Sequence, residues 1–258
     1  MKTSIWLLCC CPLLVFAEVS EDSITVAVAA NFSQPMQRIA ADFEAATRHQ
    51  VTLVSGSTGR IYAQITHGAP YDVFLAADQK TPARLAQKGF AVPDSATTYA
   101  VGRLALWSPS KVLAGDGGQW LRQGRFRRVA IANPRLAPYG AAAMQVLSAL
   151  GLRETLGSKL VQAENVMQSY HFVHSGNADL GFVAFAQLTT GNGLATGSVW
   201  LPPQDMYDPI RQDAILLMRA RDNVAAKALM RFLGSASAQS ILADHGYETI
   251  STPPSGVR

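Results

Sequence analysis

Residues 24–36, ITVAVAANFSQPM, hold a short apolar run that is followed directly by the start of a helix. The run from Ile24 to Ala30 is rich in β-branched residues, which is typical of a strand buried in a parallel sheet. Pro35 fits the first helical turn, where a missing N–H costs nothing. An i, i+3, i+4, i+7 series then predicts one apolar helix face, formed by Met36, Ile39, Ala40 and Phe43.

The same alternation of strand and helix continues along the chain. Further strands are predicted at residues 50–54, 71–76, 100–107, 128–131, 160–163, 181–184 and 214–219. Helices are predicted at residues 60–66, from the cap Asp78 to Lys88, and at 141–150, 224–233 and 236–244. A Gly/Ser turn occupies residues 55–59 and a Pro-rich loop residues 133–140. This order predicts an α/β fold with mainly parallel sheets flanked by helices.

There are more predicted strands than one sheet of this length usually needs, so two lobes are expected. The first lobe is predicted to comprise residues 23–99 and 208–258, and the second lobe residues 100–207. The chain would cross between the lobes near Val101 and Ile210, which suits a hinge. A binding cleft is then expected outside the carboxyl ends of the strands, where helices begin.

The composition is that of a globular protein with little net charge. The chain has 258 residues, 48% hydrophobic and 16% charged, and 22 Lys and Arg against 18 Asp and Glu give a formal charge of +4. The densest basic run, residues 122–128, has no aromatic residue besides Phe126, so nucleic-acid binding is not indicated. A collagen, a coiled coil and a multi-span membrane protein are also excluded.

The N-terminus has the pattern of a cleaved signal peptide, predicted to be residues 1–17. A basic start, Met1-Lys2, precedes an apolar run from Ile5 to Ala17 and a small-x-small cleavage site. A membrane anchor would need about 20 apolar residues. A lipoprotein cysteine is an alternative, but no small residues precede the candidates. All three cysteines (Cys9, Cys10 and Cys11) lie in this segment, so the mature chain is expected to lack disulfides and cysteine metal sites.

Four segments place hydrogen-bond donors between a strand and a helix. Free backbone N–H groups at a helix N-terminus, with the positive end of the dipole behind them, favour an anion without Lys or Arg. Taken singly, Ser, Thr or Asn before a helix is more often an ordinary cap. The segments are Ala30-Asn31-Phe32-Ser33, Gly56-Ser57-Thr58-Gly59, Pro138-Tyr139-Gly140 and Asn165-Val166-Met167.

Other kinds of site are indicated more weakly. Gly56 and Gly59 form neither a Walker phosphate loop nor the elbow of a hydrolase. His171 and His174 could share one helix face, but a third metal ligand is missing nearby, so no cation site is predicted. A periplasmic hydrolase that uses Ser57 with one of these histidines remains an alternative.

Five motifs, in order over about residues 24–250, resemble the periplasmic molybdate-binding proteins. The resemblance implies a two-lobed type II periplasmic solute-binding fold that closes around molybdate or tungstate. It further implies that the protein is a monomer that delivers the anion to the permease of an ABC transporter in the inner membrane. An enzymatic activity and a cofactor are not expected. The motifs are Ile24 to Phe32, Gly56-Ser57-Thr58-Gly59 with Tyr62 to Ile65, Gly68 to Gln79, Pro138-Tyr139-Gly140, and Ala163 to Val166.

The resemblance also implies which residues contact the oxyanion. Tyr139 and Val166 would contribute mainly backbone N–H groups, whereas Asn31 and Thr58 would use backbone and side chain. Ser57 lies beside Thr58, and Ala30 is a further backbone neighbour. Asp72 and Asp78 would have structural roles in the third strand–helix unit.

Two positions depart from the common pattern of the family. Many members carry Ser where this chain has Asn31, although a branch with Asn also exists. Some members have a ligand-binding Tyr at the position of Ala184, so that hydroxyl is absent here.

The resemblance agrees with the chemistry of the anion. A tetrahedral dianion has only acceptor oxygens, which suits a pocket that contains only donors. A protonated phosphate would leave its proton unsatisfied there. Sulfate also lacks a proton, so it remains an alternative ligand that only the size of the pocket could reject.

Overall fold

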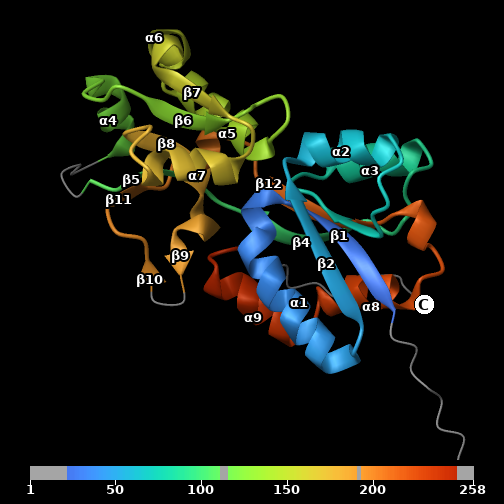
Figure 1. Ribbon diagram of the computed structural model, residues 1–258. Coiled ribbons are helices and arrows are strands. Elements are labelled where there is room, and N and C mark those ends of the chain that lie inside the picture. The colour runs from blue at the N-terminus through green and yellow to red at the C-terminus, as the bar shows by residue number, and fades with distance from the viewer. Residues whose placement is uncertain (1–21, 111–115, 191–192, 249–258) are drawn as a thin grey trace, which may run out of the picture.

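The structure, a computed structural model, describes residues 22–110, 116–190 and 193–248 and has two lobes, each built around a five-stranded sheet (Figure 1). The predicted signal peptide lies outside these residues. None of the helices in the described ranges combines the length and apolar character that a membrane span requires. We call each sheet with the helices packed on it the first lobe and the second lobe, in chain order.

The first sheet has the strand order β2-β1-β3-β12-β4. Strand β1 is parallel to both β2 and β3, whereas β12 is antiparallel to β3 and β4. Four strands therefore run in one direction and one runs against them. The bounds are β1 Ser23–Ala29, β2 Gln50–Gly56, β3 Val73–Leu75, β4 Thr97–Gly102 and β12 Ile210–Leu216.

The second sheet has the order β11-β5-β8-β6-β7 and the same plan. Strand β6 is parallel to β7 and β8, whereas β5 is antiparallel to β8 and β11. In each sheet the reversed strand, β5 or β12, is the first that the chain forms after crossing from the other lobe. The bounds are β5 Leu104–Ser108, β6 Val129–Ala132, β7 Leu160–Ala163, β8 Leu180–Ala184 and β11 Ser198–Trp200. A separate hairpin pairs β9 Thr189–Thr190 with β10 Gly193–Leu194.

Helices cover both faces of each sheet, as the strand–helix alternation predicts. On the first sheet, α1, α8 and α9 share one apolar cluster, and α2 and α3 pack against the other face. On the second sheet, α4, α5 and α6 share one cluster, and α7 covers the other face. The bounds are α1 Ser33–Thr47, α2 Thr58–Thr66, α3 Lys80–Gln87, α4 Gly117–Gln123, α5 Pro138–Ala149, α6 Arg153–Leu156, α7 Val166–His174, α8 Val224–Phe232 and α9 Ala236–Asp244.

Short 3-10 helices complete the described elements. They are η1 Ala30–Phe32, η2 Gly157–Lys159, η3 Phe185–Gln187, η4 Gln204–Met206 and η5 Met218–Ala220. The apolar face predicted for α1 is confirmed, since Met36, Ile39, Ala40 and Phe43 are all buried.

Four predicted elements have wrong limits in ways that concern the cleft. Residues 100–107 are not one strand, because β4 ends at Gly102 in the first sheet and β5 begins at Leu104 in the second. Helix α5 begins at Pro138 rather than at residue 141, and α2 at Thr58 rather than at residue 60. The last strand is Ile210–Leu216 rather than 214–219. Apolar periodicity cannot reveal the change of sheet, since both strands are buried.

Candidate functional site

The chain turns sharply after β1 and places Ala30 and Asn31 at the start of a helix. Both residues belong to η1, which runs directly into α1, and both are buried. The carboxyl end of β1 thus presents backbone N–H groups of a first helical turn, which have no acceptor within the helix. The segment between β1 and α1 is therefore itself helical.

The next unit contributes two buried hydroxyl groups. Ser57 is the N-cap residue of α2 but makes no capping hydrogen bond, and its Oγ is buried without a hydrogen-bond partner among the described residues. The Oγ of Thr58 accepts a hydrogen bond from the Ala77 N–H at 3.1 Å, which leaves the hydroxyl proton for another acceptor. Burying a polar atom without a hydrogen-bond partner costs stability, so the Ser57 hydroxyl is a candidate donor to a bound ligand.

Two further helix starts come from the second lobe. Pro138 is the first residue of α5 and Tyr139 the second. Gly140 allows this helix to begin against the end of β6, because a Cβ there would lie 2.2 Å from the Ala132 carbonyl oxygen. The side chain of Asn165 caps α7 by accepting from the Gln168 N–H at 3.0 Å, which places Val166 first in that helix.

These four helix starts meet around one small cavity between the lobes, which we call the inner cavity. It has a volume of about 10 Å³. The first lobe lines it with Ala29, Ala30, Asn31, Ser57, Thr58 and Ala77. The second lobe lines it with Ala137, Pro138, Tyr139, Asn165 and Val166.

All six residues predicted as oxyanion contacts are among these lining residues, which include no charged side chain. The structure therefore brings together Ala30, Asn31, Ser57, Thr58, Tyr139 and Val166. The lining residues that the prediction left out are mostly alanines, whose side chains give no signal of a site in a sequence.

The side chains of Asn31 and Tyr139 are already engaged within the protein. The Asn31 Nδ2 donates to Gln212 Oε1 at 2.8 Å and to the Tyr247 hydroxyl at 3.1 Å. The Tyr139 hydroxyl accepts from Gln212 Nε2 at 3.2 Å. Both Nδ2 hydrogens of Asn31 are therefore used, so Asn31 can offer its backbone N–H to the inner cavity but not the side chain that the sequence also predicted. The Tyr139 hydroxyl belongs to the same internal network, which agrees with a mainly backbone contribution from Tyr139. Sequence analysis missed Gln212 and Tyr247, because neither lies in a recognisable motif.

Contacts between the lobes hold the rim of the inner cavity. The Gly59 N–H donates to the Leu136 carbonyl at 2.8 Å, and Arg60 forms an ion pair with Glu164. A side chain at position 59 would crowd this contact, since its Cβ would lie 3.0 Å from the Leu136 Cα. The lobes are therefore in close contact beside the four helix starts.

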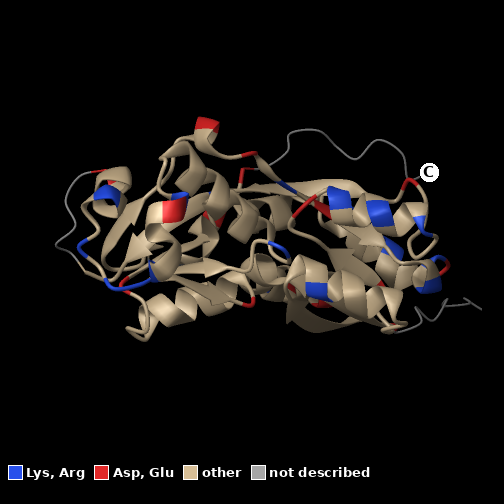
Figure 2. Ribbon diagram, turned by 90° about the horizontal axis from the view of Figure 1, so that it is seen from above, with Lys and Arg blue, Asp and Glu red and all other residues tan. Residues whose placement is uncertain are grey.

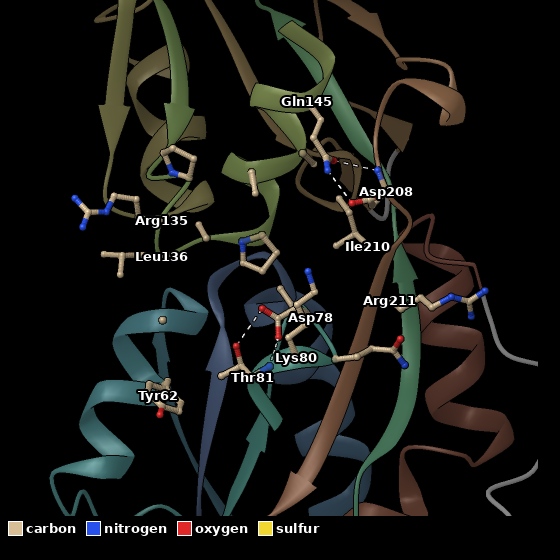
Figure 3. Close-up of a pocket in the computed structure, with 18 of the residues that line it drawn as sticks. Tyr62, Asp78, Lys80, Thr81, Arg135, Leu136, Gln145, Asp208, Ile210 and Arg211 are labelled. Carbon is tan, nitrogen blue, oxygen red and sulfur yellow. Dashed lines mark hydrogen bonds between the residues drawn. The ribbon is translucent and has the colours of Figure 1, made fainter. Parts of the chain in front are cut away.

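A second and larger hollow, of about 430 Å³, lies beside the inner cavity, and we call it the outer groove (Figure 3). It shares Ala77, Ala137 and Pro138 with the inner cavity. Charged side chains line it, namely Asp78, Lys80, Arg84, Arg135, Asp208 and Arg211. Figure 2 shows that charged residues are also spread over the outer surface of both lobes.

The two aspartates predicted to be structural have that role. Asp72 Oδ2 accepts from the Thr25 N–H at 2.7 Å, which ties the start of β3 to β1. Asp78 accepts from the Thr81 N–H at 2.8 Å and so caps the start of α3. Burial raises the pKa of Asp78, although the hydrogen bonds from Thr81 oppose this effect.

The alternative sites receive no support from the geometry. His171 and His174 are exposed in the last turn of α7 and contact the ring of Tyr170. The Ser57 Oγ has no hydrogen bond to a histidine or to any other described residue, so it lacks a general base. Within the described ranges no group of three or more metal-ligating side chains occurs. Ala184 is buried but does not line the inner cavity.

Comparison with known proteins places the chain in a family. The family described as bacterial extracellular solute-binding protein matches residues 24–248. The chain is 48% identical to the molybdate-binding protein ModA of Azotobacter vinelandii over 224 residues, which cover 87% of this chain and 89% of that protein. It is 46% identical to ModA of Rhodobacter capsulatus over 226 residues, with 88% of each covered.

A solved structure agrees with these relatives. The periplasmic molybdate-binding protein of Azotobacter vinelandii superimposes with a TM-score of 0.86 and 40% identity, covering 88% of this chain and all of that one (100%). The fold class predicted from the sequence is thereby confirmed, as is the resemblance on which the site residues were chosen. The chain belongs to the bacterial extracellular solute-binding proteins and, within them, to the family of molybdate-binding proteins.

Proposed function

We propose that the protein captures molybdate or tungstate in the periplasm and delivers it to the permease of an ABC importer. The observation that carries the proposal is the inner cavity, in which four helix starts from two lobes meet a buried hydroxyl without a partner. The relatives named above are molybdate-binding proteins. A cleaved signal peptide at residues 1–17, a monomeric state and the lack of a cofactor or catalytic activity are parts of the same proposal.

The chemistry of the lining selects a tetrahedral dianion. Backbone N–H groups and the hydroxyls of Ser57 and Thr58 are donors, and the carboxylates of the region line the outer groove instead. An oxyanion without a proton can accept from every donor, whereas a protonated phosphate would have to donate its own proton to an acceptor. Helix dipoles favour the negative charge without a cationic side chain.

Binding is proposed to involve a hinge motion of the two lobes. The sequence assigns residues 23–99 and 208–258 to the first lobe and residues 100–207 to the second. We place the first boundary slightly later, because β4 continues to Gly102 in the first sheet and β5 begins at Leu104 in the second, and the chain returns to the first sheet at β12. A volume of about 10 Å³ holds about one water molecule, so a tetrahedral anion requires the lobes to separate for entry and to reclose around it.

Titration calorimetry with molybdate, tungstate, sulfate and phosphate tests the proposal. We expect heat and tight binding with molybdate and tungstate, and at most weak binding with the other two anions. Sulfate has shorter bonds to oxygen than molybdate, so it is too small to reach all the donors at once. Binding of sulfate alone would reject the assigned ligand and favour a sulfate receptor. Turnover of a phosphoryl or acyl ester that Ser57→Ala abolishes would favour the hydrolase.

A further inference from the structure

Gln212 is a fully buried polar residue that contacts residues of both lobes that line the inner cavity. It lies on β12 and has 0% of its surface exposed. Its Oε1 accepts from Asn31 Nδ2 at 2.8 Å and lies 2.9 Å from the Tyr99 hydroxyl. Its Nε2 donates to the Tyr139 hydroxyl at 3.2 Å. One amide group thereby joins η1, β4 and the start of α5.

Tyr247 reinforces the Asn31 side of this arrangement. Its hydroxyl donates to the Asn31 carbonyl at 2.9 Å and accepts from Asn31 Nδ2 at 3.1 Å. The resulting buried network consists of Asn31, Tyr99, Tyr139, Gln212 and Tyr247. Desolvation raises the pKa of all three phenols, so they keep their protons and the network stays uncharged at neutral pH.

The contact between Gln212 and Tyr139 spans the two lobes at the point where the chain crosses. Gln212 belongs to the first sheet, whereas Tyr139 belongs to α5 of the second lobe. Gly102, the last residue before the crossing, lies against both side chains. A Cβ at position 102 would lie 2.0 Å from the Tyr139 hydroxyl oxygen and 2.5 Å from Gln212 Nε2. The contact is therefore tightly enclosed by the backbone at the crossing.

We propose that Gln212 is a positioning residue that sets the distance between the two halves of the oxyanion shell, and through it the selectivity for molybdate over sulfate. This inference rests on the function proposed above. Gln212 does not line the inner cavity, but it holds Asn31 and Tyr139, whose N–H groups come from opposite lobes. When the lobes are closed, a contact that fixes the distance between the two halves keeps the shell from contracting around a smaller anion, so sulfate loses hydrogen bonds that molybdate makes.

Two substitutions remove the contact from either side. Tyr139→Phe deletes the hydroxyl and keeps the ring and the backbone N–H, while Gln212→Met keeps the volume but removes the amide. Tyr207→Phe is the matched control. This phenol also accepts a buried N–H, here from the backbone of Leu104 at 3.3 Å, but it does not line the inner cavity. Thermal unfolding without anion shows that each variant is folded.

Calorimetry on all variants then measures molybdate and sulfate affinity. We expect the ratio of molybdate to sulfate affinity to fall about tenfold in Tyr139→Phe and in Gln212→Met, and to stay unchanged in Tyr207→Phe. In the double variant the losses should be smaller than the product of the single losses, because both changes remove the same contact. Equal weakening of both anions, or no weakening, would overturn the proposal.

The wild-type titration separates this inference from the proposed function. If the wild-type protein bound only sulfate or phosphate, the assigned ligand would be wrong. The coupling between Tyr139→Phe and Gln212→Met, measured with the anion that does bind, would still test the positioning role. Independent effects of the two substitutions on that anion would refute it.

Discussion

The inner cavity and the outer groove lie side by side between the same two lobes, yet they differ in size and in charge. The inner cavity, about 10 Å³, has an uncharged lining, whereas the groove of about 430 Å³ is lined by four cationic and two anionic side chains. Of these two hollows, a choice by size or by positive charge would select the groove. Most of the charged side chains there are exposed to solvent, whereas the buried Ser57 hydroxyl has no partner among the described residues and the first N–H groups of a helix have no acceptor within it. The difference teaches that unsatisfied donors, rather than positive charge, identify this kind of anion site.

The largest expected loss of affinity comes from a negative charge placed in the inner cavity, compared with the same charge placed in the outer groove. Ser57→Asp puts a carboxylate in the inner cavity at a position where Asp is also a good helix cap. Repulsion of the dianion should weaken molybdate binding by about 1,000-fold or more. Binding is measured by calorimetry, and the melting temperature confirms that the variant folds.

Ala141→Asp is the matched change in the groove, because Ala141 is exposed on α5 and lines only that hollow. Solvent and salt screen its charge, so affinity should change by less than about threefold at 0.15 M salt. A stronger effect in Ala141→Asp than in Ser57→Asp would reverse the comparison and place the anion in the groove.

A smaller effect is expected from removing single neutral donors. Ser57→Ala and Thr58→Val should each weaken molybdate binding by about 10- to 100-fold, since each would delete one hydrogen bond to a charged group. Thr58→Ser keeps the hydroxyl and serves as the control, with affinity close to wild type. If both deletions left the affinity unchanged, the two hydroxyls would not be ligands.

The smallest expected effect concerns a charge in the groove and involves stability alone. Burial raises the pKa of Asp78, so its contribution to stability is present below the pKa of the unfolded chain and is lost as the pH rises through the folded-state pKa. Asp78→Asn keeps an oxygen for the Thr81 N–H and removes this loss. Relative to wild type, its melting temperature should rise by about 2 °C or less between pH 4 and pH 7, with unchanged molybdate affinity. If the melting temperature of Asp78→Asn fell relative to wild type over this pH range, the ionised carboxylate would stabilise the fold.

Local patterns in the sequence were sufficient for the fold class, and the resemblance to a family named six of the residues that line the inner cavity. Apolar periodicity identified β1 and α1, because burial of one helix face is a local property of the chain. The donors at Asn31, Thr58, Tyr139 and Val166 could be chosen because they follow strands and match family motifs. Their common lining of one cavity agrees with that choice, and the anion itself stays a prediction for titration to test.

The sequence by itself determined the order of strands and helices, the lack of charge at the helix starts and the resemblance to one family. Only the tertiary structure decided that the chain changes sheet after Gly102. It also decided that the Asn31 amide donates to Gln212 and Tyr247, and that the Tyr139 hydroxyl accepts from Gln212 of the other lobe. The physical reason is sequence separation. Residues 31, 139, 212 and 247 carry no shared local pattern. Asn31 meets Gln212 and Tyr247 only because distant segments of the first lobe pack together, and Tyr139 meets Gln212 only where the two lobes touch.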